Sequence, residues 1–318
     1  MTEGRRAGNG PAPRLLGAAA MLMAMAAAVA SGCAQEAQDD VPDASGDDSP
    51  DSSAPAEVAL VTGSTGGLGR EVALGLAADG THVLIHGRDR ERGLEVVQEI
   101  EAAGGTADFL RADLASLDEV RELGDTVLEE YARLDILVNN AGVWLEPEDG
   151  RVLSDDGHEL HFQVNYLSHY LLTRLLLPRL QESAPSRVVS VASSAQQPLD
   201  FDDVMLAEDY SSGRAYAQSK LAQILFTVDL AEELEGTGVL PVALHPATMM
   251  DTEMVLSRGA EPRASVEEGR EAVLNAIRSD DVEPGAYFNG LESTRAHGQV
   301  YDEEARDRLR RLSAELTA

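Results

Sequence analysis

The chain has 318 residues, 43% of them hydrophobic, with 56 acidic against 25 basic side chains and a formal net charge of −31 at pH 7. So negative a surface repels nucleic-acid phosphates and anionic lipid headgroups, which excludes a nucleic-acid-binding role. Cys33 is the single cysteine, so no internal disulfide can form.

The N-terminal residues differ in composition from the rest of the chain. Three arginines precede an apolar run over residues 15–30, which is too short for a comfortable membrane span and is typical of a signal-peptide core. The run leads into Ala-Ser-Gly-Cys, which resembles a bacterial lipoprotein signal and predicts a lipid anchor at Cys33. A mis-assigned start codon or an uncleaved anchor are the alternatives for residues 1–33. Residues 34–56, rich in Asp, Ser, Pro and Ala, are predicted to form an acidic disordered tether.

From Val58 onward, short apolar runs alternate with amphipathic stretches, a pattern typical of a parallel sheet covered by helices on both faces. We therefore predict a single Rossmann-type doubly wound α/β domain over residues 57–318, with about seven strands. The predicted strands are Val58–Val61, His82–His86, Ala107–Arg111, Ile136–Val138, Arg187–Val191, Val239–His245 and Ala286–Phe288. The predicted helices are Gly67–Ala78, Glu91–Ala103, Leu117–Tyr131, Asp156–Gln181, Tyr216–Glu235, Val266–Ile277 and Glu303–Leu316.

A glycine-rich turn joins the first predicted strand to the first predicted helix. Gly63 allows a sharp turn, Gly67 lets the backbone approach a pyrophosphate, and Gly69 lets the helix pack closely on the sheet. The N-terminus of the helix then presents free N–H groups to a phosphate. A purely structural turn is the alternative, but the strand-turn-helix context favours a dinucleotide site.

Lys220 is the only lysine in the chain, and it follows Tyr216 by four residues. On a helix this spacing places the two side chains on one face. A tyrosine near a fixed positive charge has a pKa below its ordinary value of about 10, which suits an acid/base catalyst. The alternative is that Lys220 is an incidental charge on a solvated face.

Five separated motifs together resemble the short-chain dehydrogenase/reductase family. They are Thr-Gly-x-x-x-Gly-x-Gly (Thr62 to Gly69), Asn-Asn-Ala-Gly (Asn139 to Gly142), Phe-Gln-Val-Asn (Phe162 to Asn165), Val-Ser-Val-Ala-Ser-Ser (Val189 to Ser194) and Tyr-Ala-Gln-Ser-Lys (Tyr216 to Lys220). Within the family, the runs around Asn165 and Tyr216 and the 23-residue interval from Ser193 to Tyr216 resemble the retinol-dehydrogenase-like bacterial branch.

The resemblance implies hydride transfer between a nicotinamide and a carbonyl or carbinol carbon. It implies that Tyr216 donates or accepts the proton, while Lys220 lowers the pKa of Tyr216 and holds the nicotinamide ribose. Ser193 is implied to hydrogen-bond the substrate oxygen, and Asn165 to hold a water that links Lys220 to solvent. The implied cofactor-binding residues are Thr62, Gly63, Ser64, Gly67, Leu68, Gly69, Arg88, Asp113, Leu114, Asn140, Ala141, Gly142, Tyr216, Lys220, Pro246 and Thr248.

The end of the second predicted strand indicates which cofactor is used. Family members that use the non-phosphorylated cofactor usually place Asp or Glu there, whereas this chain has Arg88, whose guanidinium suits a 2′-phosphate. We therefore predict NADP(H) over NAD(H). Asp89 keeps NAD(H) open unless it caps the next helix, and Asp113 either lies near the adenine or caps a helix.

The segment after the sixth predicted strand is expected to border the substrate. Its His-Pro-Ala-Thr run resembles the family segment beside the nicotinamide, although alanine replaces the usual glycine, so Thr248 or Thr252 would contact the carboxamide. The residues from Met249 to Arg263 are predicted to form a mobile lid, and their methionines suggest an apolar substrate. Trp144 and the leucine after it are expected at the same cleft. The seven histidines show no metal-ligand spacing, so no metal site is predicted.

Two other functions and two localisations stay open at this point. An epimerase or dehydratase of the extended relatives is disfavoured by the glycine spacing, and a cofactor-binding sensor or tethered interaction protein without turnover is disfavoured by the intact Ser193, Tyr216 and Lys220. The long helices resemble those that pair family subunits, which predicts a homodimer or homotetramer. The leader indicates membrane attachment, whereas a dissociable NADP(H) indicates the cytoplasm.

Overall fold

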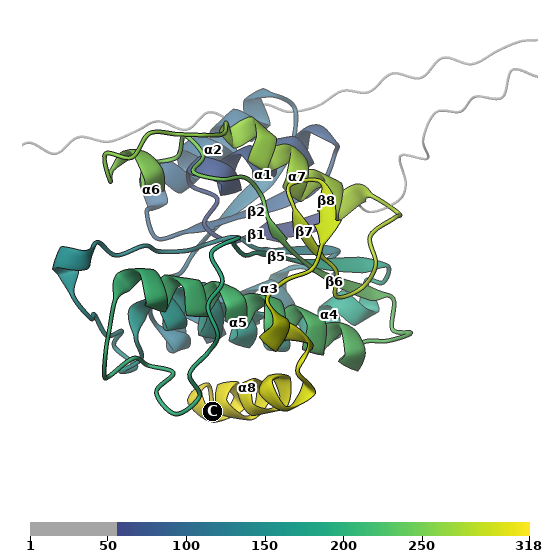
Figure 1. Ribbon diagram of the computed structural model, residues 1–318. Helices are drawn as coiled ribbons and strands as arrows, with labels where there is room; N and C mark the ends of the chain where they lie inside the picture. The colour runs from purple at the N-terminus through teal and green to yellow at the C-terminus, as the bar shows by residue number, and fades with distance from the viewer. Residues whose placement is uncertain (1–55) are drawn as a thin grey trace, which may run out of the picture. The chain divides into compact units, whose positions relative to one another are not determined.

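Figure 1 shows the computed structural model of the chain, which describes residues 56–318. The predicted leader, Cys33 and the predicted tether up to residue 55 lie outside the described residues. Within residues 56–318, no helix has both the length and the apolar character that crossing a membrane requires.

Eight strands form one sheet in the order β3-β2-β1-β4-β5-β6-β7-β8. Neighbouring strands are parallel except for β7 and β8, which pair antiparallel. The strands are β1 (Val58–Val61), β2 (His82–Gly87), β3 (Ala107–Arg111), β4 (Ile136–Asn139), β5 (Ser186–Val191), β6 (Val239–His245), β7 (Tyr287–Asn289) and β8 (Glu292–Thr294). The predicted count of about seven missed β8, because its three residues are polar and exposed and carry no apolar signal.

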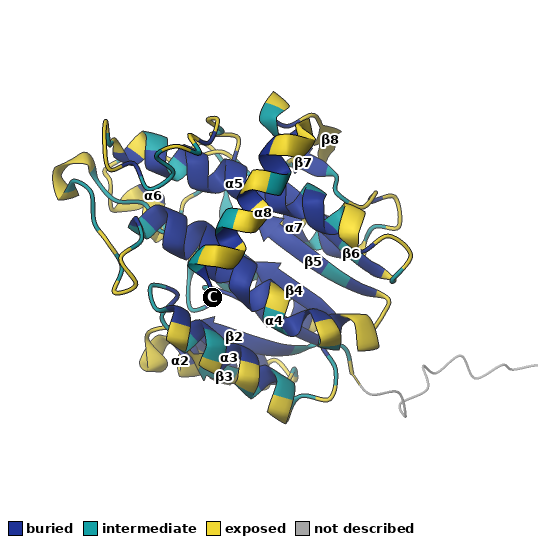
Figure 2. Ribbon diagram, turned by 90° about the horizontal axis from the view of Figure 1, so that it is seen from below, coloured by how far each residue is buried: buried dark blue, intermediate teal, exposed yellow. Residues whose placement is uncertain are grey.

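Helices cover both faces of the sheet (Figure 1). One face carries α1 (Gly67–Ala78), α2 (Arg90–Ala102) and α7 (Val266–Arg278), and the other carries α3 (Leu117–Glu130), α4 (Ser168–Glu182) and α5 (Ser212–Glu233). The remaining helices are α6 (Glu253–Leu256), α8 (Glu303–Leu316), the short 3₁₀ helices η1 (Pro147–Asp149) and η3 (Gly298–Tyr301), and the π-helix η2 (Phe162–Leu167). Figure 2 shows the buried sheet between helices whose outer faces are exposed.

The strand side chains alternate between two hydrophobic cores. Val58 and Leu60 of β1 face the core under α3, α4 and α5, whereas Ala59 and Val61 face the core under α1, α2 and α7. Strands buried on both faces read as continuous apolar runs, which is why the sequence located β1 correctly. The parallel order with helices on both faces confirms the predicted Rossmann-type fold. The chain reverses its direction of winding between β1 and β4, and such a switch point leaves a crevice at the carboxyl ends of the strands.

Two helices begin where the apolar pattern did not predict. The helix predicted from Asp156 begins at Leu160 instead, because the Asp156 carboxylate accepts the N–H of Leu117 at 3.0 Å and so caps α3. Conversely, α5 begins at Ser212, four residues before Tyr216, because the Ser211 hydroxyl accepts the N–H of Arg214 at 3.3 Å. Tyr216 therefore lies one turn inside α5.

Candidate active site

A cavity of about 620 Å³ opens at the carboxyl ends of the strands around the β1–β4 switch point. Most of the predicted site residues line it: Gly63, Gly67, Leu68, Gly69, Arg88, Asp113, Leu114, Asn140, Ala141, Gly142, Ser193, Tyr216, Lys220, Pro246 and Thr248. Thr62, Ser64 and Asn165 are not on its wall, and Thr65, Gly66, Arg92 and Arg258, which the sequence analysis did not single out, are. The predicted binding motifs thus meet in one space.

The glycine turn at the start of α1 has the geometry of a phosphate cradle. Gly63 and Gly67 adopt φ angles of +65° and +53°, in the left-handed region that favours glycine. A Cβ atom on Gly69 would lie 2.4 Å from both the Gly63 carbonyl oxygen and the Asn140 side-chain nitrogen. The turn therefore brings its own backbone and the β4 loop closer together than any side chain at Gly69 would allow.

Replacing Gly69 with Ala is expected to lower the free energy of unfolding by about 1–3 kcal/mol and to weaken cofactor binding, because the new methyl group pushes the turn open. Gly213 is the matched control, since it lies in α5 with nothing within 4 Å of its added Cβ. Chemical denaturation and dinucleotide titration would measure both effects. A Gly69→Ala protein as stable as Gly213→Ala would contradict the close approach.

Thr62 and Ser64 brace the turn from inside the protein. The Thr62 hydroxyl accepts the N–H groups of Asn140 and Ala141 at 2.9 and 3.0 Å, and the Ser64 hydroxyl donates to the Val61 carbonyl at 2.7 Å. Both side chains are fully buried. Their contacts hold the shape of the turn, whereas the neighbouring Thr65, which the sequence analysis passed over, faces the cavity.

Two arginines line the cavity near the end of β2 and the start of α2. Arg88 is 67% exposed, and its Nη1 lies 3.4 Å from an Asp113 carboxylate oxygen. Arg92 reaches back from α2 across the glycine turn, so that its Nη2 lies 2.6 Å from the position of a Cβ on Gly66. Its Nη2 also lies 3.2 Å from the Glu253 carboxylate on α6.

Asp89, the residue that kept NAD(H) open, is occupied by helix capping. Its Oδ1 accepts the N–H groups of Glu91 and Arg92 at 2.9 and 3.2 Å, at the N-terminus of α2. Asp113 uses its Oδ1 to accept the N–H of Ala115 at 2.9 Å while its other oxygen faces Arg88. Asp113 therefore shapes the loop after β3 and still lines the cavity.

Tyr216, Lys220 and Ser193 meet at the opposite end of the cavity. The Lys220 ammonium donates to the Val191 carbonyl at 2.9 Å and to the Gln223 side-chain oxygen at 3.0 Å. Its nitrogen lies 5.8 Å from the centroid of the Tyr216 ring. The i, i+4 spacing on α5 thus brings the two side chains to one wall.

The pKa values of this pair differ from the expectation that Lys220 makes Tyr216 more acidic. Burial raises the pKa of Tyr216, and a hydrogen bond with Ser193 and the charge of Arg258 lower it only in part. Burial also lowers the pKa of Lys220 from 10.5 to about 7. Burial therefore dominates the pKa of Tyr216, while the Lys220 nitrogen is hydrogen-bonded to Val191 and Gln223.

Asn165 lies in the π-helix η2 and has its side chain fully occupied. Its oxygen accepts the N–H of Val143 at 2.7 Å, and its nitrogen donates to the Val143 carbonyl and to the Ser219 hydroxyl. The residue is fully buried and pins the loop after β4 to α5. The structure therefore gives Asn165 a bracing contact behind the Lys220 wall, and the water implied by the resemblance stays a prediction.

Trp144 and Arg258, a residue of the predicted lid, lie close to Tyr216. The Trp144 and Tyr216 rings have their centroids 4.8 Å apart, and the Arg258 guanidinium lies 4.0 Å above the Trp144 ring. Arg258 also lies 3.2 Å from a Glu146 carboxylate oxygen. Met249, Met250 and Met254 line the cavity from the predicted lid, whereas Leu145 and the exposed Leu256 do not.

The threonine that would face a carboxamide is not decided by the hydrogen bonds. The Thr248 hydroxyl is 3.0 Å from His245 Nε2, and the Thr252 side chain lies 3.5 Å from the position of a Cβ on Gly67. Both threonines line the cavity. Among residues 56–318, no group of three or more His, Cys, Asp or Glu side chains is placed to hold a metal ion.

A glycine turn at a parallel-sheet switch point and a Tyr–Lys pair in one cavity define a dinucleotide-dependent oxidoreductase of the Rossmann class. A family model described as short chain dehydrogenase matches residues 57–263. The chain belongs to this family.

Its similar relatives include retinol dehydrogenases. Retinol dehydrogenase 12 from Mus musculus is 36% identical over 276 residues, which cover 82% of this chain and 86% of that protein. Retinol dehydrogenase 11 from Homo sapiens is 41% identical over 199 residues, which cover 61% of this chain and 62% of that protein. These similarities confirm the retinol-dehydrogenase-like resemblance.

Two solved structures with NADP share the fold. A short chain dehydrogenase from Burkholderia cenocepacia J2315 in complex with NADP superposes with a TM-score of 0.61 and 28% identity, covering 73% of this chain and 95% of that one. The RhlG/NADP active-site complex from Pseudomonas aeruginosa superposes with a TM-score of 0.60 and 27% identity, covering 73% and 94%.

Proposed function

We propose that the protein is an NADP(H)-dependent dehydrogenase or reductase of an apolar alcohol or carbonyl compound, with Tyr216 as its acid/base. The observation that carries this proposal is the convergence of Tyr216, Ser193 and Lys220 on the cavity that also contains the glycine turn. The glycine turn suits a pyrophosphate, and the other end offers a phenol and a hydroxyl to a small reacting oxygen.

The cavity fits a nicotinamide dinucleotide in shape and in polar groups. The left-handed Gly63 and Gly67 shape the turn next to the N-terminus of α1, where a pyrophosphate would bind. His86 Nε2, on a residue of the cavity wall, is buried without a hydrogen-bond partner, which suits a polar occupant. Lys220 would hold the ribose hydroxyls beside the nicotinamide.

The cofactor supplies or accepts the hydride when it is bound. In the reductive direction Tyr216 gives its proton to the carbonyl oxygen, and in the oxidative direction its deprotonated form takes the proton from the alcohol. Burial raises the pKa of Tyr216, so the phenol is protonated at neutral pH and ready to donate. Ser193, which bonds the phenol, would also hold the substrate oxygen as negative charge develops there.

Two cations at one end of the cavity support NADP(H) over NAD(H). Arg88 extends from the end of β2 and Arg92 crosses the glycine turn, so both guanidinium groups are within the wall where a 2′-phosphate would bind. Asp89, the acidic alternative, is used as a helix cap. The NADP complexes of the Burkholderia cenocepacia and Pseudomonas aeruginosa proteins support the same preference.

Replacing Arg88 and Arg92 together with Ala is expected to raise the KM for NADPH by about 100-fold or more, since each of the two charged hydrogen bonds contributes on the order of 1.5–3 kcal/mol. The KM for NADH should change much less, because NADH lacks the 2′-phosphate. Arg90→Ala is the matched control, since Arg90 is exposed on the same helix and is not on the cavity wall. A wild-type protein with a clear preference for NADH would refute the proposed role of these arginines.

An apolar substrate is supported by the cavity wall around Tyr216. The Trp144 ring lies against the Tyr216 ring, and three methionines line the same cavity, where methionine adapts well to irregular apolar ligands. The similarity to retinol dehydrogenases supports the same substrate class. A screen of aldehydes, ketones and alcohols of graded chain length, followed by nicotinamide absorbance, tests this assignment. Dinucleotide binding without turnover of any compound would instead support the sensor alternative.

A further inference from the structure

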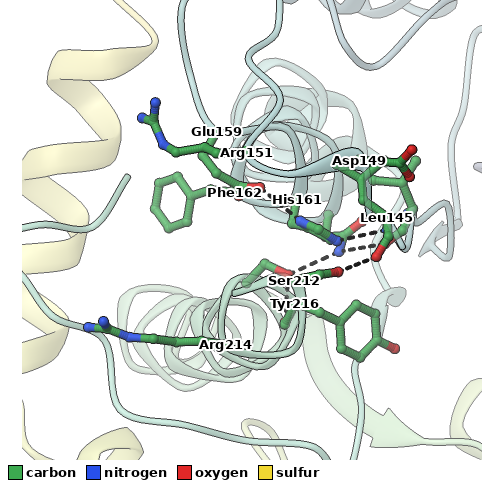
Figure 3. Close-up of polar contacts among 12 residues, drawn as sticks. Leu145, Asp149, Arg151, Glu159, His161, Phe162, Ser212, Arg214 and Tyr216 are labelled. Atoms are coloured by element: carbon green, nitrogen blue, oxygen red, sulfur yellow. Dashed lines mark hydrogen bonds and ion pairs between the residues drawn. The ribbon is translucent and has the colours of Figure 1, made fainter. Parts of the chain in front are cut away.

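Glu159 and His161 form a buried polar pair beside Tyr216 that the proposed reaction does not use. Their side chains are 1% and 0% exposed, and neither residue lines the cavity. His161 Nδ1 lies 2.8 Å from a Glu159 carboxylate oxygen. Figure 3 shows this pair facing the loop that holds Leu145, on the side of Tyr216 away from its hydroxyl.

The hydrogen bonds of this pair fix one state of the histidine ring. His161 Nε2 lies 3.1 Å from the backbone nitrogen of Leu145, and a backbone N–H can only donate. Nε2 must therefore accept, and the ring proton lies on Nδ1, where it is donated to Glu159. The second oxygen of Glu159 accepts the N–H of Phe162 at 2.8 Å, so both carboxylate oxygens are used.

Leu145 is held from its other backbone group as well. The Ser212 hydroxyl donates to the Leu145 carbonyl (Figure 3). Ser212 opens α5, and Tyr216 follows one helical turn later. The N–H of Leu145 is thus bonded to His161, and its carbonyl is bonded to Ser212 at the start of α5.

The residue before Leu145 is Trp144, whose ring touches the ring of Tyr216. The two ring centroids are 4.8 Å apart, and the His161 ring meets the Tyr216 ring edge-on at 6.4 Å. His161 therefore contacts Tyr216 directly and also fixes the loop that brings Trp144 against it. Displacing the Leu145 peptide would move Trp144, which forms part of the cavity wall.

We propose that Glu159 and His161 are positioning residues that set the place of Trp144 and the orientation of Tyr216, and so determine how an apolar substrate is aligned for proton transfer. A buried carboxylate is a poor means of gaining stability alone, because apolar side chains of the same volume would serve as well. The pair instead orients the loop, because the one acceptor atom of His161, Nε2, binds the one N–H of Leu145. This inference rests on the proposed function for its effect on turnover.

Trp144 is the only tryptophan in the chain, so its fluorescence reports the position of this loop without any reaction. The first variant is His161→Leu, which keeps an apolar side chain but removes the acceptor for Leu145. The second is His161→Gln, whose amide oxygen reaches the position of Nε2 and restores that acceptor. His82→Gln, at the opposite end of β2 from the cavity, is the matched histidine control.

We expect His161→Leu to shift the Trp144 emission and to raise its quenching by acrylamide. Its kcat should fall by about 10- to 100-fold, because a small misplacement of reacting groups carries a penalty of this size. The Kd for NADPH should stay within about two-fold, since neither Glu159 nor His161 lines the cavity. His161→Gln should return the emission and most of the kcat, and His82→Gln should match the wild type.

If His161→Leu does not fold, Glu159→Gln is the second test. Its amide offers one acceptor for two N–H donors, so one of the contacts to His161 or Phe162 is lost and the emission should shift part of the way. Unchanged emission and kcat in the folded variants would overturn the positioning role, as would equal losses in His161→Gln and His161→Leu. Failure of the proposed function is distinguishable, because the wild type would then lack turnover while the fluorescence changes persist.

Discussion

Replacing Tyr216 with Phe is expected to lower kcat by about 100- to 10,000-fold, the range that a positioned proton donor contributes. The substitution removes one oxygen atom and keeps the ring, so the contacts with Trp144 and His161 persist. The Ser193 hydroxyl loses its phenolic partner but still faces the cavity. The loss should therefore appear in turnover and leave the fold unaltered.

Nicotinamide absorbance would give kcat for this variant, and fluorescence titration would give the Kd for NADPH, which should remain measurable and close to that of the wild type. Tyr131→Phe is the control, because Tyr131 bonds Asp108 beyond the end of α3 and is not on the cavity wall. Turnover by Tyr216→Phe at the wild-type rate would exclude the proposed mechanism.

Replacing Lys220 with Met is expected to lower kcat by a similar order, about 100-fold or more, without lowering stability. Methionine matches the length of the side chain but cannot hold the ribose hydroxyls. The free energy of unfolding should not fall, because Lys220 is only 4% exposed and burying its charge opposes folding.

The stability difference between the two proteins should depend on pH in a defined direction. Burial lowers the pKa of Lys220 from 10.5 to about 7 in the folded state, so between these values the unfolded chain binds more protons. The wild type therefore gains stability relative to Lys220→Met as pH rises from about 7 to about 10.5. Below pH 7 the lysine is charged in both states, and the full penalty of burying the charge applies.

Denaturation of both proteins at several pH values would measure this difference. Lys220→Arg is the informative partner, because a guanidinium stays charged when buried and is bulkier than an ammonium, so both activity and stability should fall. A Lys220→Met protein that keeps full activity would exclude a role for the ammonium. The lowered pKa of Lys220 would be contradicted if the free energy of unfolding of the wild type fell, relative to that of Lys220→Met, as pH rises above 7.

Local patterns in the sequence were sufficient for the elements that carry the site. The β1 strand and the glycine turn are contiguous and have strong signals, and the spacing of Tyr216 and Lys220 on one helix is fixed by helical geometry. The strand β8 could not be found this way, because its exposed polar residues are ordered only by pairing with β7.

The features that the sequence did not predict depend on contacts between distant segments. Arg92 faces the cavity because α2 lies next to the glycine turn, and its carboxylate partner, Glu253, is 161 residues further along the chain. The environment of Tyr216 also depends on such contacts: the sequence places Lys220 near the phenol, but only the folded chain reveals that burial and Ser193 dominate its pKa. Spacing along a helix indicates proximity, and proximity alone does not settle which atoms bond.

Because Lys220 is the single lysine, reagents that attack side-chain amines have one target in this chain. Every other cationic side chain apart from the histidines is arginine, which acylating and reductively alkylating reagents leave untouched. Burial lowers the pKa of Lys220 to about 7, so more of its amine is the uncharged nucleophile at neutral pH than in an exposed lysine. The proposed reaction site is therefore also the one internal position at which amine chemistry can attach a probe to this protein, and a bound dinucleotide would shield it.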